Sequence, residues 1–162
     1  MKKKEPLIFV IDNNKNYRHL VVNALQAFNL NNILTFSEAK QSYAAMKQQP
    51  DLVILEYNLG GDLNGLEIMK NARMKFPATE FIFLSSKNDI ALAVEAIKWG
   101  AADYIIKSKF ALSSLMSRVE KILHFRNKMN KAQRLQNQLI LSLGLVLLSL
   151  ITLVMLYNHH VL

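Results

Sequence analysis

Four side chains that could do chemistry together lie at the ends of apolar runs: Asp12, Glu56, Ser85 and Lys107. In a parallel sheet the carboxyl ends of the strands share one edge, so we expect these four groups to converge there. Two carboxylates, a hydroxyl and an ammonium suit a divalent cation and a phosphoryl group, because carboxylates bind the metal while Lys and Ser bind phosphate oxygens. The competing interpretation is four polar loop residues that never meet.

Five apolar, strand-like runs alternate with helical patterns, and they cover residues 7–11, 32–36, 52–55, 81–84 and 104–106. Because these runs lack polar alternation, the strands should be covered on both faces. The pattern predicts an α/β fold with a doubly wound, five-stranded parallel sheet. The helices should cover 15–28, a segment capped by Ser37, 65–76, 89–99 with Gly100 as its left-handed end, and a last helix from Ala111.

An uncharged apolar stretch of 19 residues, 139–157, lies near the end of the sequence. A helix of this length spans about 28 Å, close to the hydrocarbon core of a bilayer at about 30 Å. Because the stretch is apolar on every side, it favours a transmembrane helix over a buried core helix or a coiled-coil seam.

The formal net charge of +8 is concentrated beside this stretch. Residues 117–134 contain six Lys and Arg residues against Glu120 alone, a local balance of +5. By the positive-inside rule, residues 1–134 should stay in the cytoplasm and residues 158–162 should form a short extracytoplasmic tail. The prediction is a single-pass membrane protein, in the inner membrane if the cell is Gram-negative. The cations then face lipid, and we expect no nucleic-acid partner.

The last helix contains no proline or glycine between Ala111 and Gly144, so we expect it to run unbroken into the membrane span. It carries a heptad-like stripe at alternating steps of three and four residues, formed by Ile122, Phe125, Met129, Ala132, Gln136 and Leu139. Two interpretations stay open: a solvated linker helix with an accidental stripe, or a homodimer seam within residues 111–138.

Over about residues 5–125 the sequence resembles the receiver domains of two-component response regulators. The matching segments are Ile11-Asp12-Asn13, Gly65-Leu66-Glu67, Leu84-Ser85-Ser86 and Gly100-Ala101-Ala102-Asp103-Tyr104-Ile105-Ile106-Lys107. The resemblance implies a flavodoxin-like fold with strand order 2-1-3-4-5. With the charge and hydropathy patterns, it divides the chain into a receiver-like domain (1–125), a basic juxtamembrane helical linker (126–138), a transmembrane helix (139–157) and the tail (158–162).

The sequence departs from that family at two places that matter for its chemistry. The family's phosphoacceptor Asp is replaced by Glu56, and its acidic metal-binding pair is reduced to Asp12 and Asn13. Asn58 aligns with the residue whose carbonyl binds metal in the family. The resemblance therefore implies, at most, a weak Mg²⁺ site at Asp12, Asn13, Glu56 and Asn58, and we expect no required cofactor.

The longer side chain of Glu56 should prevent the usual phosphorylation, because a misplacement of about 1 Å can cost on the order of 10²-fold in rate. We expect Glu56 to pair with Lys107 instead. In the family, Ser85 matches the switch hydroxyl, Tyr104 the rotating aromatic residue and Lys107 the phosphate-binding ammonium. Either Glu56 mimics the phosphorylated state, or the site is vestigial and the domain is a docking surface. Ser108 replaces the family's proline, which predicts a trans peptide bond there.

These observations predict a membrane-tethered, atypical receiver of a phosphorelay system. It would act by contact with signalling proteins such as a histidine kinase or a phosphotransfer protein, and not as an enzyme. The alternatives are a Mg²⁺-binding receiver still capable of phosphoryl transfer and a dimeric membrane scaffold. The sequence has no cysteine, which excludes a disulfide framework, a thiolate metal site and cysteine catalysis.

Overall fold

The computed structural model describes residues 5–61 and 63–161. Five parallel strands form one sheet in the order β2-β1-β3-β4-β5, which confirms the predicted order. The strands are β1 (Ile8–Ile11), β2 (Ile33–Phe36), β3 (Leu52–Leu55), β4 (Glu80–Ser85) and β5 (Asp103–Ile106). Each differs from its predicted bounds by one residue or less at either end.

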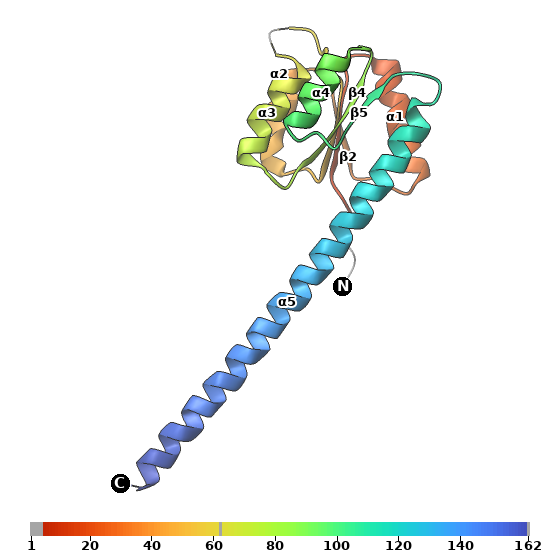
Figure 1. Cartoon of the computed structure of the whole chain (residues 1–162). Helices are drawn as coiled ribbons and strands as arrows, with labels where there is room; N and C mark the ends of the chain where they lie inside the picture. Colours follow the sequence, from red (N-terminus) through yellow and green to blue (C-terminus); the bar gives the residue numbers. More distant parts are fainter. Residues whose placement is uncertain (1–4, 62, 162) are drawn as a thin grey trace. The chain divides into compact units, whose positions relative to one another are not determined.

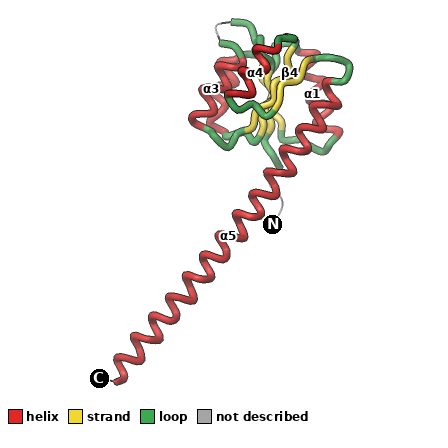
Figure 2. Tube along the Cα trace, in the orientation of Figure 1, coloured by secondary structure: helices red, strands yellow, loops and turns green. Residues whose placement is uncertain are grey.

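Helices connect the strands and cover both faces of the sheet (Figure 1). They are α1 (Lys15–Ala27), α2 (Ala39–Ala45), the short 3₁₀ helix η1 (Met46–Gln48), α3 (Gly65–Lys75), α4 (Ile90–Lys98) and α5 (Ala111–Val161). The helices α2, α3 and α4 lie on one side of the sheet, and α1 lies on the other. Figure 2 shows the strands enclosed between these helical layers, as a doubly wound fold requires.

The central strands are buried on both faces, which explains their unbroken apolar runs. Every residue of β1 and β3 is buried. Phe9, Val53 and Phe81 pack in one cluster with residues of α2, α3 and α4. Because side chains alternate along a strand, Ile8 and Ile54 point to the opposite face. There the buried side chains of α1 and of the first turns of α5 are Val21, Leu25, Ala111, Leu115, Met116 and Val119.

The helix ends of α3 and α4 have the capping residues typical of their positions, whereas the start of α2 differs from the prediction. Asn64 and Glu67 form a capping box at the start of α3, with reciprocal bonds of 3.1 and 3.0 Å between side chain and backbone. Gly100 follows α4 with φ +94°, as predicted. The prediction of Ser37 as a cap is wrong, because α2 begins one residue later, and its N-cap residue Glu38 makes no side-chain capping bond.

The chain forms two compact units, Met1–Lys121 and Ile122–Leu162. The first contains the sheet and its helices. The second consists of the remainder of α5, which continues without interruption to Val161. This helix is long and apolar enough to cross a membrane, and none of its most apolar 18-residue window is buried. Of the predicted tail at 158–162, residue Leu162 lies outside the described residues.

Candidate functional site

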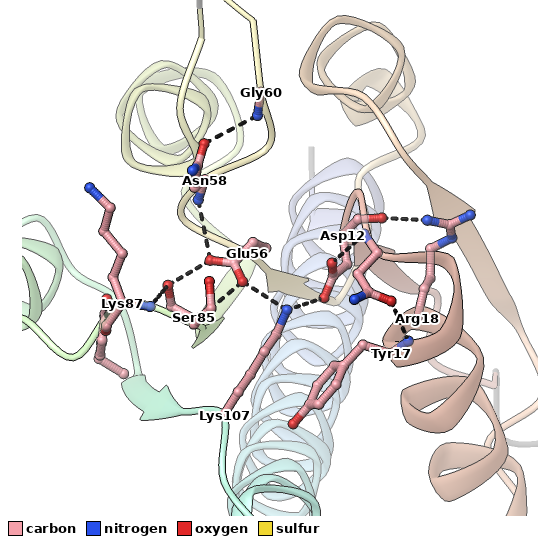
Figure 3. A network of polar contacts seen from close by, with 12 residues as sticks. Asp12, Tyr17, Arg18, Glu56, Asn58, Gly60, Ser85, Lys87 and Lys107 are labelled. Carbon is pink, nitrogen blue, oxygen red and sulfur yellow. Dashed lines mark hydrogen bonds and ion pairs between the residues drawn. The ribbon is translucent and has the colours of Figure 1, made fainter.

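The four side chains singled out by the sequence converge at the carboxyl edge of the sheet (Figure 3). Asp12 follows β1, Glu56 follows β3, Ser85 ends β4 and Lys107 follows β5. The strands β1, β3, β4 and β5 are successive neighbours in the sheet, so residues at their carboxyl ends lie side by side. Asp12, Glu56 and Ser85 are all buried.

The Glu56 carboxylate accepts hydrogen bonds at both oxygens, although its side chain is only 2% exposed. Oε1 accepts from the Ser85 hydroxyl at 2.6 Å and from the Asn58 backbone N–H at 3.2 Å. Oε2 accepts from the Ser86 backbone N–H at 3.0 Å and pairs with Lys107 Nζ at 2.7 Å. Four donors therefore hold one carboxylate, two on each oxygen.

Lys107 lies between the two carboxylates and binds both. Its ammonium is 2.6 Å from Asp12 Oδ2 and 2.7 Å from Glu56 Oε2. The other oxygen of Asp12 accepts from the backbone N–H of Asn14 at 2.9 Å. The ring of Tyr17 lies beside the ammonium, with 4.4 Å between Nζ and the ring centroid, a favourable cation–π distance. Lys107 is thus the common partner of the site's two acidic groups (Figure 3).

The contacts shift the pKa values of Glu56 and Lys107 in the directions that favour their charged forms. Burial alone would raise the pKa of Glu56, but hydrogen bonds from Lys107, Ser85 and the Ser86 N–H outweigh it and lower that pKa. Burial would likewise lower the pKa of Lys107, yet bonds to Asp12 and Glu56 raise it. Glu56 is therefore a carboxylate and Lys107 an ammonium at neutral pH.

The residues expected to hold a metal fit Mg²⁺ poorly in this arrangement. Both carboxylates already contact Lys107, so two negative charges are offset by one positive charge. Asn13 is exposed and contributes no charge, and the Asn58 side-chain oxygen accepts from the Gly60 N–H at 3.3 Å. No group of three or more acids or histidines with metal-binding geometry occurs among the described residues. Mg²⁺ binding at this edge stays a prediction.

The two residues that resemble the family's switch are linked through Lys87. The Ser85 hydroxyl, which donates to Glu56, also accepts from the Lys87 backbone N–H at 3.2 Å. The Tyr104 hydroxyl donates to the Lys87 carbonyl at 2.9 Å. The Tyr104 ring stacks on Phe83, with 5.8 Å between centroids. A polar path thus runs from Glu56 to Tyr104, while the switching role of these residues stays a prediction.

Two residues of α1 that our sequence reasoning did not assign to the site belong to its surroundings. Arg18 donates to the backbone carbonyl of Asp12, and Tyr17 packs against Lys107. The Tyr17 hydroxyl is buried and has no hydrogen-bond partner among the described residues, and burial raises its pKa. In the sequence, Tyr17 is only one residue of the predicted helix 15–28, so the sequence signal for its place at the site was weak.

The loops beside the site have two properties that follow from their sequence. The bond between Lys107 and Ser108 is trans, as predicted, since the described residues contain no cis peptide. Gly60 and Gly61, in the loop after β3, have φ of +72° and +82°, a region that glycine enters without steric cost. A Cβ at Gly65 would clash with the backbone just after β3, so α3 begins in close contact with the site.

This fold, with acidic, hydroxyl and ammonium groups at the carboxyl edge of a 2-1-3-4-5 sheet, defines a flavodoxin-like domain. The family model for the response regulator receiver domain matches residues 8–120. The chain therefore belongs to the response regulator receiver family, whose members are signalling modules.

Relatives and solved structures agree with this assignment. The chain is 26% identical over 124 residues to the DNA-binding transcriptional regulator NtrC of Salmonella typhimurium, covering 75% of this chain and 26% of NtrC. It is 34% identical over 76 residues to the alginate biosynthesis regulator AlgB of Pseudomonas syringae, covering 46% and 17%. The chain thus spans about a quarter or less of the length of these relatives.

Among solved structures, the receiver domain of NtrX from Brucella abortus superimposes with a TM-score of 0.65 at 30% identity, covering 72% of this chain and 98% of that domain. The BeF3-activated receiver domain of DrrB gives the same TM-score at 27% identity, covering 74% and 97%. These matches cover nearly all of the solved receiver domains.

Proposed function

We propose that this protein is a membrane-tethered atypical receiver that signals by protein contact, with Glu56 fixed where the family places its phosphoacceptor. The observation that carries this proposal is the set of four donors on the Glu56 carboxylate. A carboxylate that already binds an ammonium, a hydroxyl and two N–H groups is a poor nucleophile, because attack would first break these bonds.

The contacts of Glu56 also support partial mimicry of a phosphorylated residue. Its oxygens bind Ser85 and Lys107, the two groups that the family resemblance assigns to phosphoryl oxygens. Through Ser85 and Lys87, the same carboxylate is connected to the Tyr104 hydroxyl. One carboxylate has less charge and fewer acceptors than a phosphoryl group, so the mimicry is incomplete.

Two further features support tethering and protein contact. The apolar part of α5 meets the length requirement of a membrane span, and the basic segment before it fits a cytoplasmic side. A tether confines partners to a surface and raises their effective concentration without new contacts. On the receiver unit, α4 and the residue after it expose large apolar side chains suited to a protein partner: Ile90, Val94, Ile97 and Trp99.

The test is incubation of the full chain with Mg²⁺ and acetyl phosphate, followed by intact mass measurement. We expect no phosphoryl adduct on the wild-type chain. Glu56→Asp, which restores the family's acceptor, is the matched variant, and an adduct on it would show that the reagents and pocket are competent. Stoichiometric phosphorylation of the wild-type chain at Glu56 would refute the proposal.

A further inference from the structure

The predicted linker (126–138) and the helical turn before it (122–125) together form the juxtamembrane segment of α5. This segment exposes large apolar side chains on one stripe. Phe125 is 65% exposed and Met129 is 55% exposed. Ile122, Phe125, Met129 and Ala132 follow one another at steps of three and four residues, so they share a helix face. This face is apolar from Ile122 to Ala132. It continues through the polar Gln136 to Leu139 at the start of the predicted span.

The charges around this stripe all have one sign. The juxtamembrane segment contains four Lys and Arg residues, and no Asp or Glu follows Glu120 in the sequence. With Met129 at heptad position a and Phe125 at d, Arg126 and Lys128 occupy positions e and g, on the two flanks of the stripe. Arg134 occupies position f, on the opposite side of the helix.

Lipid headgroups do not cover these apolar residues. Met129 and Phe125 precede Leu139 by 10 and 14 residues, which corresponds to about 15 and 21 Å along a helix. The headgroup layer on one side of a bilayer is only about 5–8 Å thick. Anionic lipid therefore accounts for cations near the span but leaves Phe125 and Met129 in water.

A second copy of this chain is also a poor occupant of the stripe. Two parallel copies in register would bring eight Lys and Arg residues together, four from each chain, with no acidic residue in either segment. Positions e and g set partner choice in coiled coils, and here they offer only cations, Gln133 and Leu135. Like charges at this spacing destabilise the pairing.

We propose that the juxtamembrane stripe binds an acidic amphipathic helix of a second membrane protein, with apolar residues at a and d and Asp or Glu at e and g. The stripe supplies the apolar seam, and Lys128 at position g supplies a charge complementary to such a helix. Two adjacent membrane spans hold the short segments at high effective concentration, which compensates for a seam of only a few heptads. This inference rests on the proposed membrane tether for the placement of the partner beside the bilayer.

The experiment uses the full chain reconstituted in phosphatidylcholine vesicles, which carry no net anionic lipid. The probe is a designed single-span peptide whose juxtamembrane heptads carry Leu at a and d and Glu at e and g. A second probe has Lys in place of every Glu. Energy transfer between labels on the chain and on each probe measures their association as the probe is titrated into the vesicles. We expect the acidic probe to associate and the basic probe to associate far more weakly.

Variants of the chain separate the apolar seam from the charges. Phe125→Gln with Met129→Gln should weaken binding of the acidic probe by about tenfold or more. Lys128→Glu should weaken it by about two- to fivefold and strengthen binding of the basic probe. Arg134→Glu, the matched control, makes the same charge change on the far side of the helix and nearer the span, so it should have little effect.

Each remaining outcome overturns a specific statement. Equal association of both probes, or a larger effect of Arg134→Glu than of Lys128→Glu, would refute an acidic helical partner. Association of the chain with itself, abolished by Phe125→Gln with Met129→Gln, would assign the stripe to a second copy. Flotation of the chain with the vesicles is measured in the same samples. Loss of flotation would refute the tether, whereas flotation without acidic preference would refute the partner alone.

Discussion

The carboxyl edge of the sheet and the juxtamembrane segment differ in the signs of the charges that they contain. At the sheet edge, the buried carboxylates of Asp12 and Glu56 both bind Lys107 within 2.7 Å. On the juxtamembrane segment, cations surround the exposed side chains of Phe125 and Met129, and the sequence supplies no acid there. At the sheet edge the charged groups pair within the chain, whereas the juxtamembrane segment exposes apolar side chains among Lys and Arg residues.

This difference supports the proposed action through protein contact. The polar groups at the sheet edge bind one another. Large apolar side chains are exposed instead on α4 and the C-terminal helix. Fold alone does not imply function, so membership of the receiver family is compatible with the proposed action through these surfaces.

The largest expected effect concerns the predicted membrane span of the C-terminal helix. Leu147→Arg with Leu148→Arg places two charges near the middle of the predicted span, at a cost of about 5–7 kcal/mol for the pair. The variant should no longer float with vesicles and should be extracted by alkaline carbonate. Gln133→Arg, outside the predicted span, is the control and should behave as wild type. Unchanged flotation of the double variant would show that residues 139–157 do not anchor the chain in the membrane.

The next largest effect concerns the ion pairs at the carboxyl edge of the sheet. Lys107→Met leaves two buried carboxylates without their cation, which should lower the free energy of unfolding by about 3–5 kcal/mol. Urea unfolding followed by circular dichroism measures the change. Lys109→Met, at an exposed lysine, is the control. Adding Glu56→Gln to Lys107→Met should restore part of the loss, and a loss below about 1 kcal/mol would mean that the network is dispensable.

The smallest effect is the pH dependence of the stability that Glu56 and Lys107 contribute. Because the folded-state pKa of Glu56 lies below its ordinary value of 4.5, the stabilisation is present above that pH and is lost as pH falls through the folded pKa. Lys107 has its pKa raised above 10.5, so its contribution is present below that pH and is lost as pH rises through the folded pKa. Glu56→Gln should cost about 1–3 kcal/mol at neutral pH and flatten the acid limb of the urea midpoint. Identical acid limbs in the two proteins would show that Glu56 carries no such linkage.

The sequence predicted the sheet and the convergence of its edge residues because both depend on local pattern. Unbroken apolar runs marked the strands, and parallel pairing then required Asp12, Glu56, Ser85 and Lys107 to meet. The strand β4 is longer than expected, because polar residues at both of its ends still join the ladder. The predicted N-cap of α2 was wrong because more than one polar residue could occupy the N-cap position, and only tertiary packing selects among them.

The contacts of α1 with the site could not be predicted from pattern. Tyr17 and Arg18 reach Lys107 and the Asp12 carbonyl only because α1 has a particular rotation against the sheet. Periodicity gives the face of a helix that is buried, but the contacts at its margin depend on how neighbouring side chains pack. The number of donors on Glu56 also depends on a loop backbone that has no periodic signal.

The position of Tyr17 gives the ion-pair network an intrinsic spectroscopic label. Its ring centroid lies 4.4 Å from Lys107 Nζ, so the ring current of the phenol shields the protons at the end of that lysine. We therefore expect the ε-methylene resonances of Lys107 to lie upfield of their usual position in the NMR spectrum while the ammonium bridges Asp12 and Glu56. Any ligand or partner that draws Lys107 away from the carboxylates changes these shifts, and the state of a buried site becomes visible without a reporter group.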